Sequence, residues 1–302
     1  LIRAEGVDIV HARSRAPAWS ARAAAQRTGR PLVTTFHGVY NAGNYLKRCY
    51  NAIMTKGDRV IAISDFIAEH IDAHYRVDPA RVTVIHRGVD LDVFDPRKVP
   101  PPRLIQLAEK WRLPDGAPVI MLPGRLTRWK GQAVFLEAIK RLGRDDIGAV
   151  LLGSDQGRVA YRSELEDLVR KRGLEKIVRF VDDARDMSAA LMLADVVVSA
   201  STDPEAFGRV IAEAQAMGRP VVATNHGGAR ETVIEGSTGW LVPPRDPDAL
   251  AAAMAEALSL DASARQRLAR DAISHVRSHF SKQVMGERTL AVYAGLLRQA
   301  RR

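Results

Sequence analysis

Short runs of β-branched residues alternate with helical patterns along almost the whole chain, and this alternation most constrains the fold. It is typical of βαβ units, in which parallel strands form a sheet that helices cover on both faces. We therefore expect an α/β fold. The expected strands are 7–11, 32–35, 59–62, 82–85, 119–122, 149–153, 178–181, 195–200, 220–224 and 239–242. The expected helices are 18–27, 46–55, 65–74, 104–111, 132–142, 161–172, 187–193, 207–217 and 247–258.

The length and a cluster of prolines predict two Rossmann-like lobes. A chain of 302 residues exceeds the size at which a single core usually keeps growing. The prolines gather between Pro96 and Pro118, where they stiffen the chain and prevent strand pairing. Because the chain opens at Leu1 in what reads as a helix end, we expect the first lobe to be incomplete. The predicted parts are a first lobe, a hinge, a second lobe and a basic C-terminal helix, at residues 1–98, 99–117, 118–275 and 276–302.

The composition favours anionic partners and a reducing compartment. The net charge of +10 suits nucleic acid, an anionic membrane or a nucleotide-linked small molecule, and an Arg-rich proteome would also explain it. Cys49 is the single cysteine, which excludes an intramolecular disulfide and a thiolate metal cluster. No apolar run reaches the roughly 20 residues that span a bilayer. We predict a cytoplasmic protein, either free or peripheral at the inner face of the membrane.

The strongest functional pattern is the segment 201–213, which directly follows an expected strand. Glu205 lies in the loop, and Glu213 lies about two turns into a helix expected to begin near Phe207. Ligands bind at the carboxyl ends of the strands in an open α/β sheet, so both carboxylates belong at one site. The first backbone N–H groups of that helix, from Phe207, Gly208 and Arg209, would form an anion site.

Two further loops after strands have the residues of a phosphate site. Gly124 and Arg125 begin a loop that Lys130 ends, and the two cations suit a diphosphate, because Arg binds phosphate in a bidentate manner and Lys adds a point charge. Gly227 and Gly228 follow the expected strand 220–224, where they allow the backbone to approach a ligand closely.

Together these motifs resemble the retaining glycosyltransferase family 4, which has the glycosyltransferase-B fold. The resemblance implies that Glu213 binds the ribose hydroxyls of a nucleotide-sugar donor and that Glu205 contacts the hydroxyls of the transferred sugar. It further implies that Arg125 and Lys130 take the place of a metal ion. The glycine pair would lie near the donor sugar and the pyrophosphate. No metal and no other cofactor is therefore expected.

In the first lobe, the sequence Phe36-His37-Gly38 ends an expected strand. A lone histidine is more often structural than catalytic, but the family places a similar motif beside the reacting anomeric carbon. The resemblance therefore makes His37 a catalytic residue with a positioning role, together with Arg125, Lys130 and Glu205. The family usually has Asn at the position of Arg87, and this departure puts an Asn-specific contact in doubt.

Three further sets of residues are weaker candidates. Gly153 follows the second strand of the second lobe and is expected near the nucleotide. Asp182 and Asp183 follow the next strand, where the base would rest. Asp90 and Asp92 have the spacing of a metal-binding pair, but they lie in a turn and we interpret them as a loop cap.

The resulting function is the transfer of a sugar, with retention, from a nucleotide-sugar to a glycan or lipid-linked acceptor of the envelope polysaccharide or lipopolysaccharide type. A sugar-nucleotide 2-epimerase of the same fold is the alternative. A nucleic-acid binder is disfavoured because no helix-turn-helix, aromatic RNA-binding pair or zinc module occurs. Family members begin with a strand and a Gly-rich loop that would precede Leu1, so we expect weakened or absent activity.

The C-terminal region is strongly basic and predicts a peripheral contact with an anionic membrane. A solvated helix explains the same charges equally well. The basic residues are Arg265, Arg267, Arg270, Arg277, Lys282, Arg288, Arg298, Arg301 and Arg302.

Overall fold

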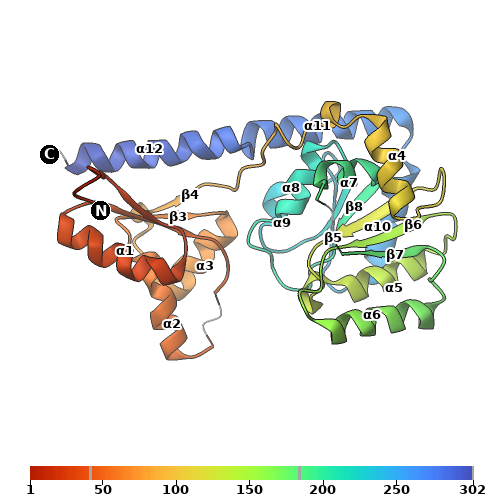
Figure 1. Ribbon diagram of the computed structural model, residues 1–302, viewed down its shortest axis with the longest axis horizontal. Coiled ribbons are helices and arrows are strands. Elements are labelled where there is room, and N and C mark those ends of the chain that lie inside the picture. The colour runs from red at the N-terminus through yellow and green to blue at the C-terminus, as the bar shows by residue number, and fades with distance from the viewer. Residues whose placement is uncertain (41–42, 183–184, 301–302) are drawn as a thin grey trace. The chain divides into compact units, whose positions relative to one another are not determined.

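The computed structural model describes residues 1–40, 43–182 and 185–300, and the chain forms two compact units (Figure 1). Unit 1 comprises Leu1–Gly88 and Lys282–Arg302, and unit 2 comprises Val89–Ser281. Each unit has one sheet, and every described strand pair in both sheets is parallel. The α/β fold with two Rossmann-like sheets is therefore confirmed.

Unit 1 has a four-stranded sheet in the order β1-β2-β3-β4. The strands are β1 Val10–Ala12, β2 Leu32–Phe36, β3 Arg59–Ala62 and β4 Val82–Val84. The helices are α1 Arg15–Thr28, α2 Tyr45–Asn51, η1 Ala52–Thr55, α3 Asp65–Tyr75, η2 Pro79–Arg81 and α12 Lys282–Ala300. In the sequence α12 is far from the rest of the unit, yet its Leu296 is buried with Val33, Ile61 and Ile85 of the sheet.

Unit 2 has a six-stranded sheet in the order β10-β9-β8-β5-β6-β7. The strands are β5 Val119–Pro123, β6 Gly148–Leu152, β7 Val178–Val181, β8 Val196–Ser199, β9 Val221–Thr224 and β10 Trp240–Val242. The helices are η3 Pro96–Lys98, α4 Pro101–Lys110, η4 Arg128–Lys130, α5 Gln132–Leu142, α6 Val159–Arg172, α7 Met187–Leu193, α8 Arg209–Ala216, α9 Ala229–Thr232, α10 Pro247–Ser259 and α11 Ala262–His279.

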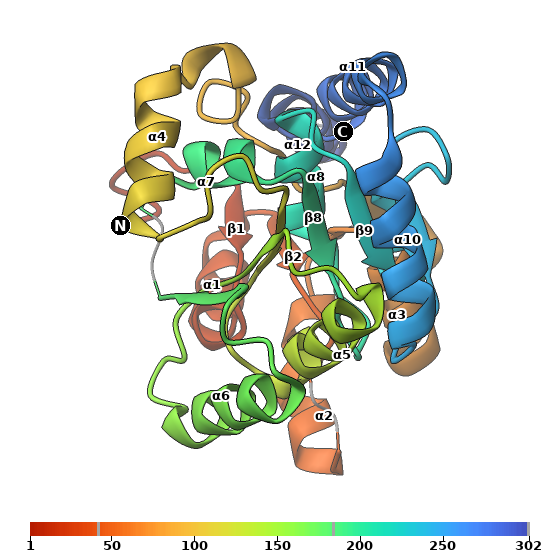
Figure 2. The same ribbon diagram turned by 90° about the vertical axis from the view of Figure 1, so that its right-hand side faces the viewer.

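The sheet of unit 2 is buried on both faces (Figure 2). Ile120 and Leu122 of β5 pack with α5, α6 and α10, whereas Met121, on the opposite face of the same strand, packs with α7 and α8. Successive side chains of a strand point to opposite faces, so a strand with both faces covered has to be apolar throughout. This explains why β5 and β6, which are wholly buried, appear in the sequence as uninterrupted apolar runs.

The borders of the compact units differ from the borders expected at residues 98, 117 and 275. The proline-rich segment 99–117 belongs to unit 2, because Val99 and Trp111 are buried in its core and α4 lies against α7. The basic C-terminal region is two helices rather than one, and α12 belongs to unit 1. The apolar side of α12 packs on the sheet of unit 1. This contact joins parts of the sequence that are far apart.

The start of one helix also differs from the expectation. The helix after β8 begins at Arg209 instead of Phe207, because Gly208 has a left-handed backbone with φ of +82° and serves as the N-cap.

No helix among the described residues is long and apolar enough to cross a membrane.

The first prediction concerns the packing of α12. Leu296 is 5% exposed and Leu290, on the same helix, is 64% exposed. We expect Leu296→Ala to lower the free energy of unfolding of unit 1 by about 2–4 kcal/mol, because it removes buried methyl groups and leaves a cavity. The matched change Leu290→Ala should cost about 0.5 kcal/mol or less. Amide hydrogen exchange in β2 and β3 measures both values, and equal effects of the two changes would contradict the packing.

Candidate functional site

The order of the strands in unit 2 defines where a ligand can bind. β5 pairs with β6 on one side and with β8 on the other, so the chain changes direction along the sheet between β5 and β8. In open α/β sheets, ligands usually bind at the carboxyl ends of the strands on either side of such a change of direction. Residues 124–131 follow β5, and residues 200–208 follow β8.

An ion pair joins these two loops. Lys130 Nζ lies 2.7 Å from Glu205 Oε1, and the two side chains are 15% and 13% exposed. Ser199 Oγ donates to the same carboxylate oxygen at 3.2 Å, and Ser201 Oγ donates to it as well. Burial raises the pKa of Glu205, but the Lys130 ammonium and the two hydroxyls outweigh it and hold the pKa below its usual value. Glu205 is therefore an ionised acceptor.

The two loops also approach each other through their backbones. Thr202 donates its N–H to the carbonyl of Trp129 at 2.7 Å. Next to Lys130, Gly131 has a φ of +73°, and a Cβ atom there would lie 1.8 Å from the carbonyl oxygen of Ala200. Glycine is thus required at position 131, because a side chain would push the loops apart and break the ion pair.

Gly227 and Gly228 contact protein backbone in this structure. A Cβ at Gly227 would lie 2.4 Å from the carbonyl oxygen of Glu205, and one at Gly228 would lie 2.5 Å from the Cα of Phe207. Gly228 also donates its N–H to the carbonyl of Glu205 at 2.8 Å. The loop after β9 therefore supports the loop that has Glu205. His226 adds a contact from its Nε2 to the carbonyl of Ser201 at 2.8 Å.

Helix α8 follows the Glu205 loop and orients the second carboxylate. Arg209 donates to Glu213 Oε1 from Nε at 3.0 Å and from Nη2 at 2.6 Å, and the Glu213 side chain is buried. Phe207 is buried edge-on against Phe280, so the side chain of Phe207 belongs to the core. The first N–H groups of α8 have no partner within the helix, as at any helix N-terminus.

The remaining donor-site candidates lie around β5 and β6. Arg125 is exposed, and its carbonyl accepts a hydrogen bond from Gln132 Nε2 at 2.9 Å. Gly124 and Gly153 pack together, since a Cβ at Gly153 would lie 2.2 Å from the carbonyl oxygen of Gly124. Asp182 forms an ion pair with Arg162. Asp183 lies outside the described residues.

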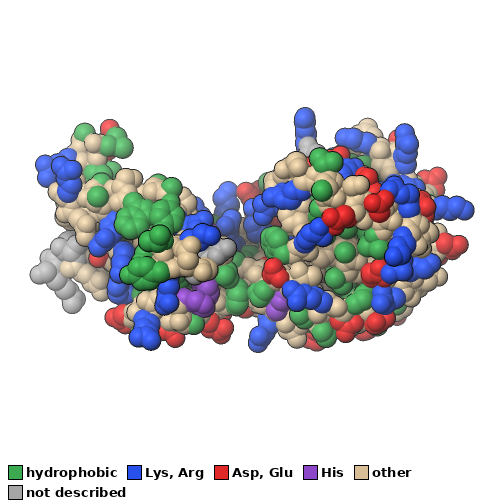
Figure 3. All heavy atoms as spheres, turned by 90° about the horizontal axis from the view of Figure 1, so that it is seen from below, with side chains coloured by type: hydrophobic (Ala, Val, Ile, Leu, Met, Phe, Trp, Pro, Cys, Tyr) green, Lys and Arg blue, Asp and Glu red, His purple; other side chains and the backbone are tan. Residues whose placement is uncertain are grey.

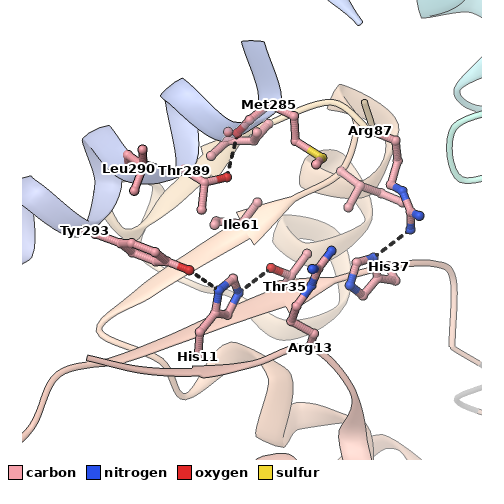
Figure 4. A pocket seen from close by; sticks show the side chains of 13 residues that line it. His11, Arg13, Thr35, His37, Ile61, Arg87, Met285, Thr289, Leu290 and Tyr293 are labelled. Carbon is pink, nitrogen blue, oxygen red and sulfur yellow. Dashed lines mark hydrogen bonds between the residues drawn. The ribbon is translucent and has the colours of Figure 1, made fainter. Parts of the chain in front are cut away.

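Unit 1 has a pocket of about 240 Å³ at the carboxyl ends of its strands (Figure 4). His37 lines it, and Arg87 donates to His37 Nδ1 from Nη1 at 3.2 Å. Burial lowers the pKa of His37 to about 4, with further contributions from Arg87, Arg13 and His11. His37 is therefore a neutral imidazole near pH 7. Because Arg87 can only donate, Nδ1 accepts and the ring proton lies on Nε2.

A second hydrogen-bonded histidine in this pocket was not predicted from the sequence. His11 lies between Tyr293 and Thr35, with its Nδ1 2.5 Å from the Tyr293 hydroxyl and its Nε2 2.7 Å from Thr35 Oγ1 (Figure 4). Burial, and then Arg13, lower the pKa of His11 to about 4. His11 ends the strand expected at 7–11, and this position was a usable signal. The contact with Tyr293 was not, because 282 residues separate the two side chains.

The two sets of residues have different chemical capacities. Unit 2 has a buried, charge-balanced pair at a strand crossover, an exposed arginine in the same loop as the lysine of that pair, and a helix N-terminus. Such a set of groups suits an anion that also has hydroxyl groups. Unit 1 has a pocket with two neutral imidazoles, two guanidinium groups and no carboxylate among its described lining residues.

These features are those of the glycosyltransferase-B class of enzymes, and comparisons with known proteins identify the family. Residues 105–275 match the family described as Glycosyl transferases group 1, and residues 1–93 match Glycosyltransferase Family 4. The chain belongs to the glycosyltransferase group 1 family. It is 34% identical over 291 residues to a D-inositol 3-phosphate glycosyltransferase of Xylanimonas cellulosilytica, covering 88% of this chain. The chain spans 67% of the length of that protein, and 56% and 50% of two Corynebacterium proteins with the same name.

Solved structures have the same fold. A glycosyltransferase from Rickettsia africae superposes with a TM-score of 0.91 at 37% identity, over 98% of this chain and 78% of that one. Anabaena Alr3699/HepE, whose structure was solved in complex with UDP and glucose, superposes with a TM-score of 0.86 at 25% identity, over 97% of this chain and 79% of that one.

The second prediction concerns the ion pair between Lys130 and Glu205. We expect Glu205→Gln to lower the free energy of unfolding of unit 2 by about 3 kcal/mol, because it leaves a buried ammonium without its counter-charge. Adding Lys130→Met should recover part of the loss. The matched control is Glu164→Gln, which breaks an exposed pair with Arg128 and should cost less than about 1 kcal/mol. Hydrogen exchange in β5 and β8 gives the values, and similar losses for both glutamates would contradict the argument.

The pocket of unit 1 makes a third prediction, which concerns pH. Because the pKa of His37 and of His11 is about 4 in the folded protein and near 6.5 in the unfolded chain, the unfolded chain binds more protons between these values. The free energy of unfolding of unit 1 should therefore be constant above pH 6.5 and fall as the pH decreases toward 4. NMR titration of the imidazoles measures the pKa values directly.

The same titration tests the contact with Arg87. Arg87→Gln should raise the pKa of His37 from about 4 but leave it below 6.5, since burial is the largest cause of the shift. Arg22→Gln, which removes a charge outside the pocket lining, should leave the pKa of His37 unchanged. An unchanged pKa in the Arg87 variant would show that the guanidinium does not act on His37.

Proposed function

We propose that this chain transfers a sugar, with retention of anomeric configuration, from a nucleotide-sugar donor bound in unit 2 to a hydroxyl group of an acceptor. The observation that carries the proposal is the buried pair of Lys130 and Glu205 at the crossover of β5 and β8, with the exposed Arg125 in the same loop as Lys130. A strand crossover with cations and a helix N-terminus favours a diphosphate. The UDP and glucose bound by the Anabaena protein support the same donor class.

Each donor-site residue has a role in the proposal. Arg125 and Lys130 bind the diphosphate and stabilise the charge that grows on it as the bond to the sugar breaks. The ionised Glu205 accepts hydrogen bonds from hydroxyls of the transferred sugar, which holds the anomeric carbon in place. Glu213, already oriented by Arg209, accepts from the ribose hydroxyls.

We propose that the acceptor attacks the face of the sugar from which the nucleoside diphosphate leaves. His37 takes part as a neutral imidazole that presents an Nε2–H donor for positioning. The acceptor we propose is a glycan or a lipid-linked glycan of the cell envelope, of which lipopolysaccharide is one type. Since two cations supply the charge that a divalent ion would supply, we also propose that the reaction requires no metal ion and continues in the presence of a chelator.

Donor binding makes the fourth prediction. Arg125→Ala should weaken the binding of the preferred nucleoside diphosphate about 10–100-fold, because a charge-assisted hydrogen bond contributes about 1.5–3 kcal/mol. Arg128→Ala is the matched control, since Arg128 lies in the same loop but forms an ion pair with Glu164. Calorimetric titration with UDP, GDP and ADP measures the affinities and identifies the base.

The products of the reaction test the remaining parts of the proposal. We expect NMR of the product to show the same anomeric configuration as the donor, with chelator present. Conversion of the donor to free nucleoside diphosphate and an altered sugar, without transfer to any acceptor, would instead establish a 2-epimerase. Binding of none of the three nucleotides would contradict the donor site itself.

A further inference from the structure

The N-terminal part of unit 1 has a stretch without acidic residues. No Asp or Glu occurs between Asp8 and Asp58, although Asp and Glu number 35 in the whole chain. The same stretch has eight basic residues: Arg13, Arg15, Arg22, Arg27, Arg30, Lys47, Arg48 and Lys56. Arg30 pairs with Asp8 at 3.8 Å, and the other seven have no carboxylate partner in the part of the chain that the structure describes. The positive charge of α1 and α2 is therefore left for an outside partner.

Helix α2 is apolar where a surface helix is normally polar. Tyr45 and Leu46 are 78% and 77% exposed, and Tyr50 and Cys49 are exposed as well. Asn51 is the buried residue of this helix. The helix is well formed, since Asn44 caps it by accepting the N–H of Lys47 at 2.8 Å. Large exposed apolar side chains on one short element usually mark an interaction surface.

An aromatic contact joins α1 and α2. Trp19 of α1 stacks on Tyr50 of α2, with ring centroids 6.2 Å apart and planes 27° apart. Arg15 lies over the ring of Tyr40 at 4.3 Å and donates to Asn51 at 2.7 Å, which fixes α1 against α2. Figure 3 shows hydrophobic side chains gathered on this unit with Lys and Arg around them. We call this the α1–α2 surface and define it by Trp19, Tyr45, Leu46, Tyr50 and the basic residues of α1 and α2.

We propose that the α1–α2 surface docks the protein onto an anionic lipid bilayer. Trp and Tyr rings with apolar bodies and polar edges prefer the headgroup level of a membrane, where Leu46 can enter the acyl region. The basic residues around them attract anionic headgroups. A second copy of this chain fits poorly, because two such surfaces would bring like charges together.

The C-terminal helices are a poorer membrane contact than the α1–α2 surface. The buried Leu296, with Val292 and Tyr293 beside it, turns the apolar side of α12 toward the sheet of unit 1, so that side is not available to lipid. In α11, Arg265 lies 3.4 Å from Asp195, which neutralises part of its charge. Membrane docking is separate from the transferase reaction, and binding to vesicles can be measured without any activity.

The test is co-sedimentation with phosphatidylcholine vesicles, with and without about 30% phosphatidylglycerol. The whole chain should bind the anionic vesicles and not the neutral ones, and binding should weaken in high salt. Cys49 is the single cysteine and lies on the surface, so an environment-sensitive dye attached to it should become more fluorescent on anionic vesicles.

Matched variants distinguish vesicle binding through this surface from nonspecific vesicle binding by other parts of the protein. Tyr45→Ser with Leu46→Ser should lower the bound fraction about tenfold, whereas Ile105→Ser with Val159→Ser, which changes two exposed apolar residues of unit 2, should not. Arg22→Gln with Lys47→Gln should weaken binding, whereas Arg288→Gln with Arg298→Gln on α12 should leave it unchanged. All four are changes of exposed or half-buried residues and should leave the fold intact.

Three results would overturn the proposal. The first is a negative vesicle experiment, in which either the unchanged chain does not bind anionic vesicles or all four variants bind them equally well. The second is light scattering that shows a dimer which the Tyr45 and Leu46 changes dissociate, because a second copy would then cover the surface. The third is tighter binding of single-stranded RNA than of vesicles, lost with the same changes, since aromatic and basic residues also suit stacked bases.

Discussion

The ion pair between Lys130 and Glu205 holds together the carboxyl ends of β5 and β8, and the rest of the donor region is arranged around it. Ser199 and Ser201 orient the carboxylate, Gly131 lets the two loops meet, and Gly228 supports the loop from behind. A carboxylate that is both buried and ionised needs such partners, because burial alone would neutralise it. In the proposed reaction, the same partners would fix the position of the carboxylate that accepts hydrogen bonds from the sugar.

Much of the fold could be predicted from the sequence because its signals are local. The β-branched runs mark the strands, and Ser64 and Asp246 cap the helices that follow them by accepting backbone N–H groups. The start of α8 was misplaced by two residues, since the left-handed backbone of Gly208 cannot be distinguished in the sequence from an ordinary helical glycine. The placement of α12 depends on packing with residues far away in the chain, which no local pattern specifies.

The sequence pattern nominated residues for the candidate site, but their contacts could not be predicted from it. The pattern of charges and glycines after the strands indicated Arg125, Lys130, Glu205 and Glu213. It gave no sign that Lys130 and Glu205 would pair, because that contact requires β5 and β8 to be neighbours. The glycine pair at 227 and 228 was expected to face a ligand, and in the structure it packs against the Glu205 loop. The roles of all these residues in a reaction remain predictions.

Unit 1 consists of two separate segments of the chain, and this affects how it folds during synthesis. Unit 2 is one uninterrupted segment, whereas unit 1 needs both Leu1–Gly88 and the helix that begins at Lys282. Its sheet therefore keeps the apolar face around Val33, Ile61 and Ile85 uncovered while the intervening 193 residues of unit 2, Val89–Ser281, leave the ribosome. Domains generally fold in the order of their synthesis. Here the segment Leu1–Gly88 is translated before unit 2, but unit 1 is completed after it, so unit 1 is the part that most needs protection by chaperones on the nascent chain.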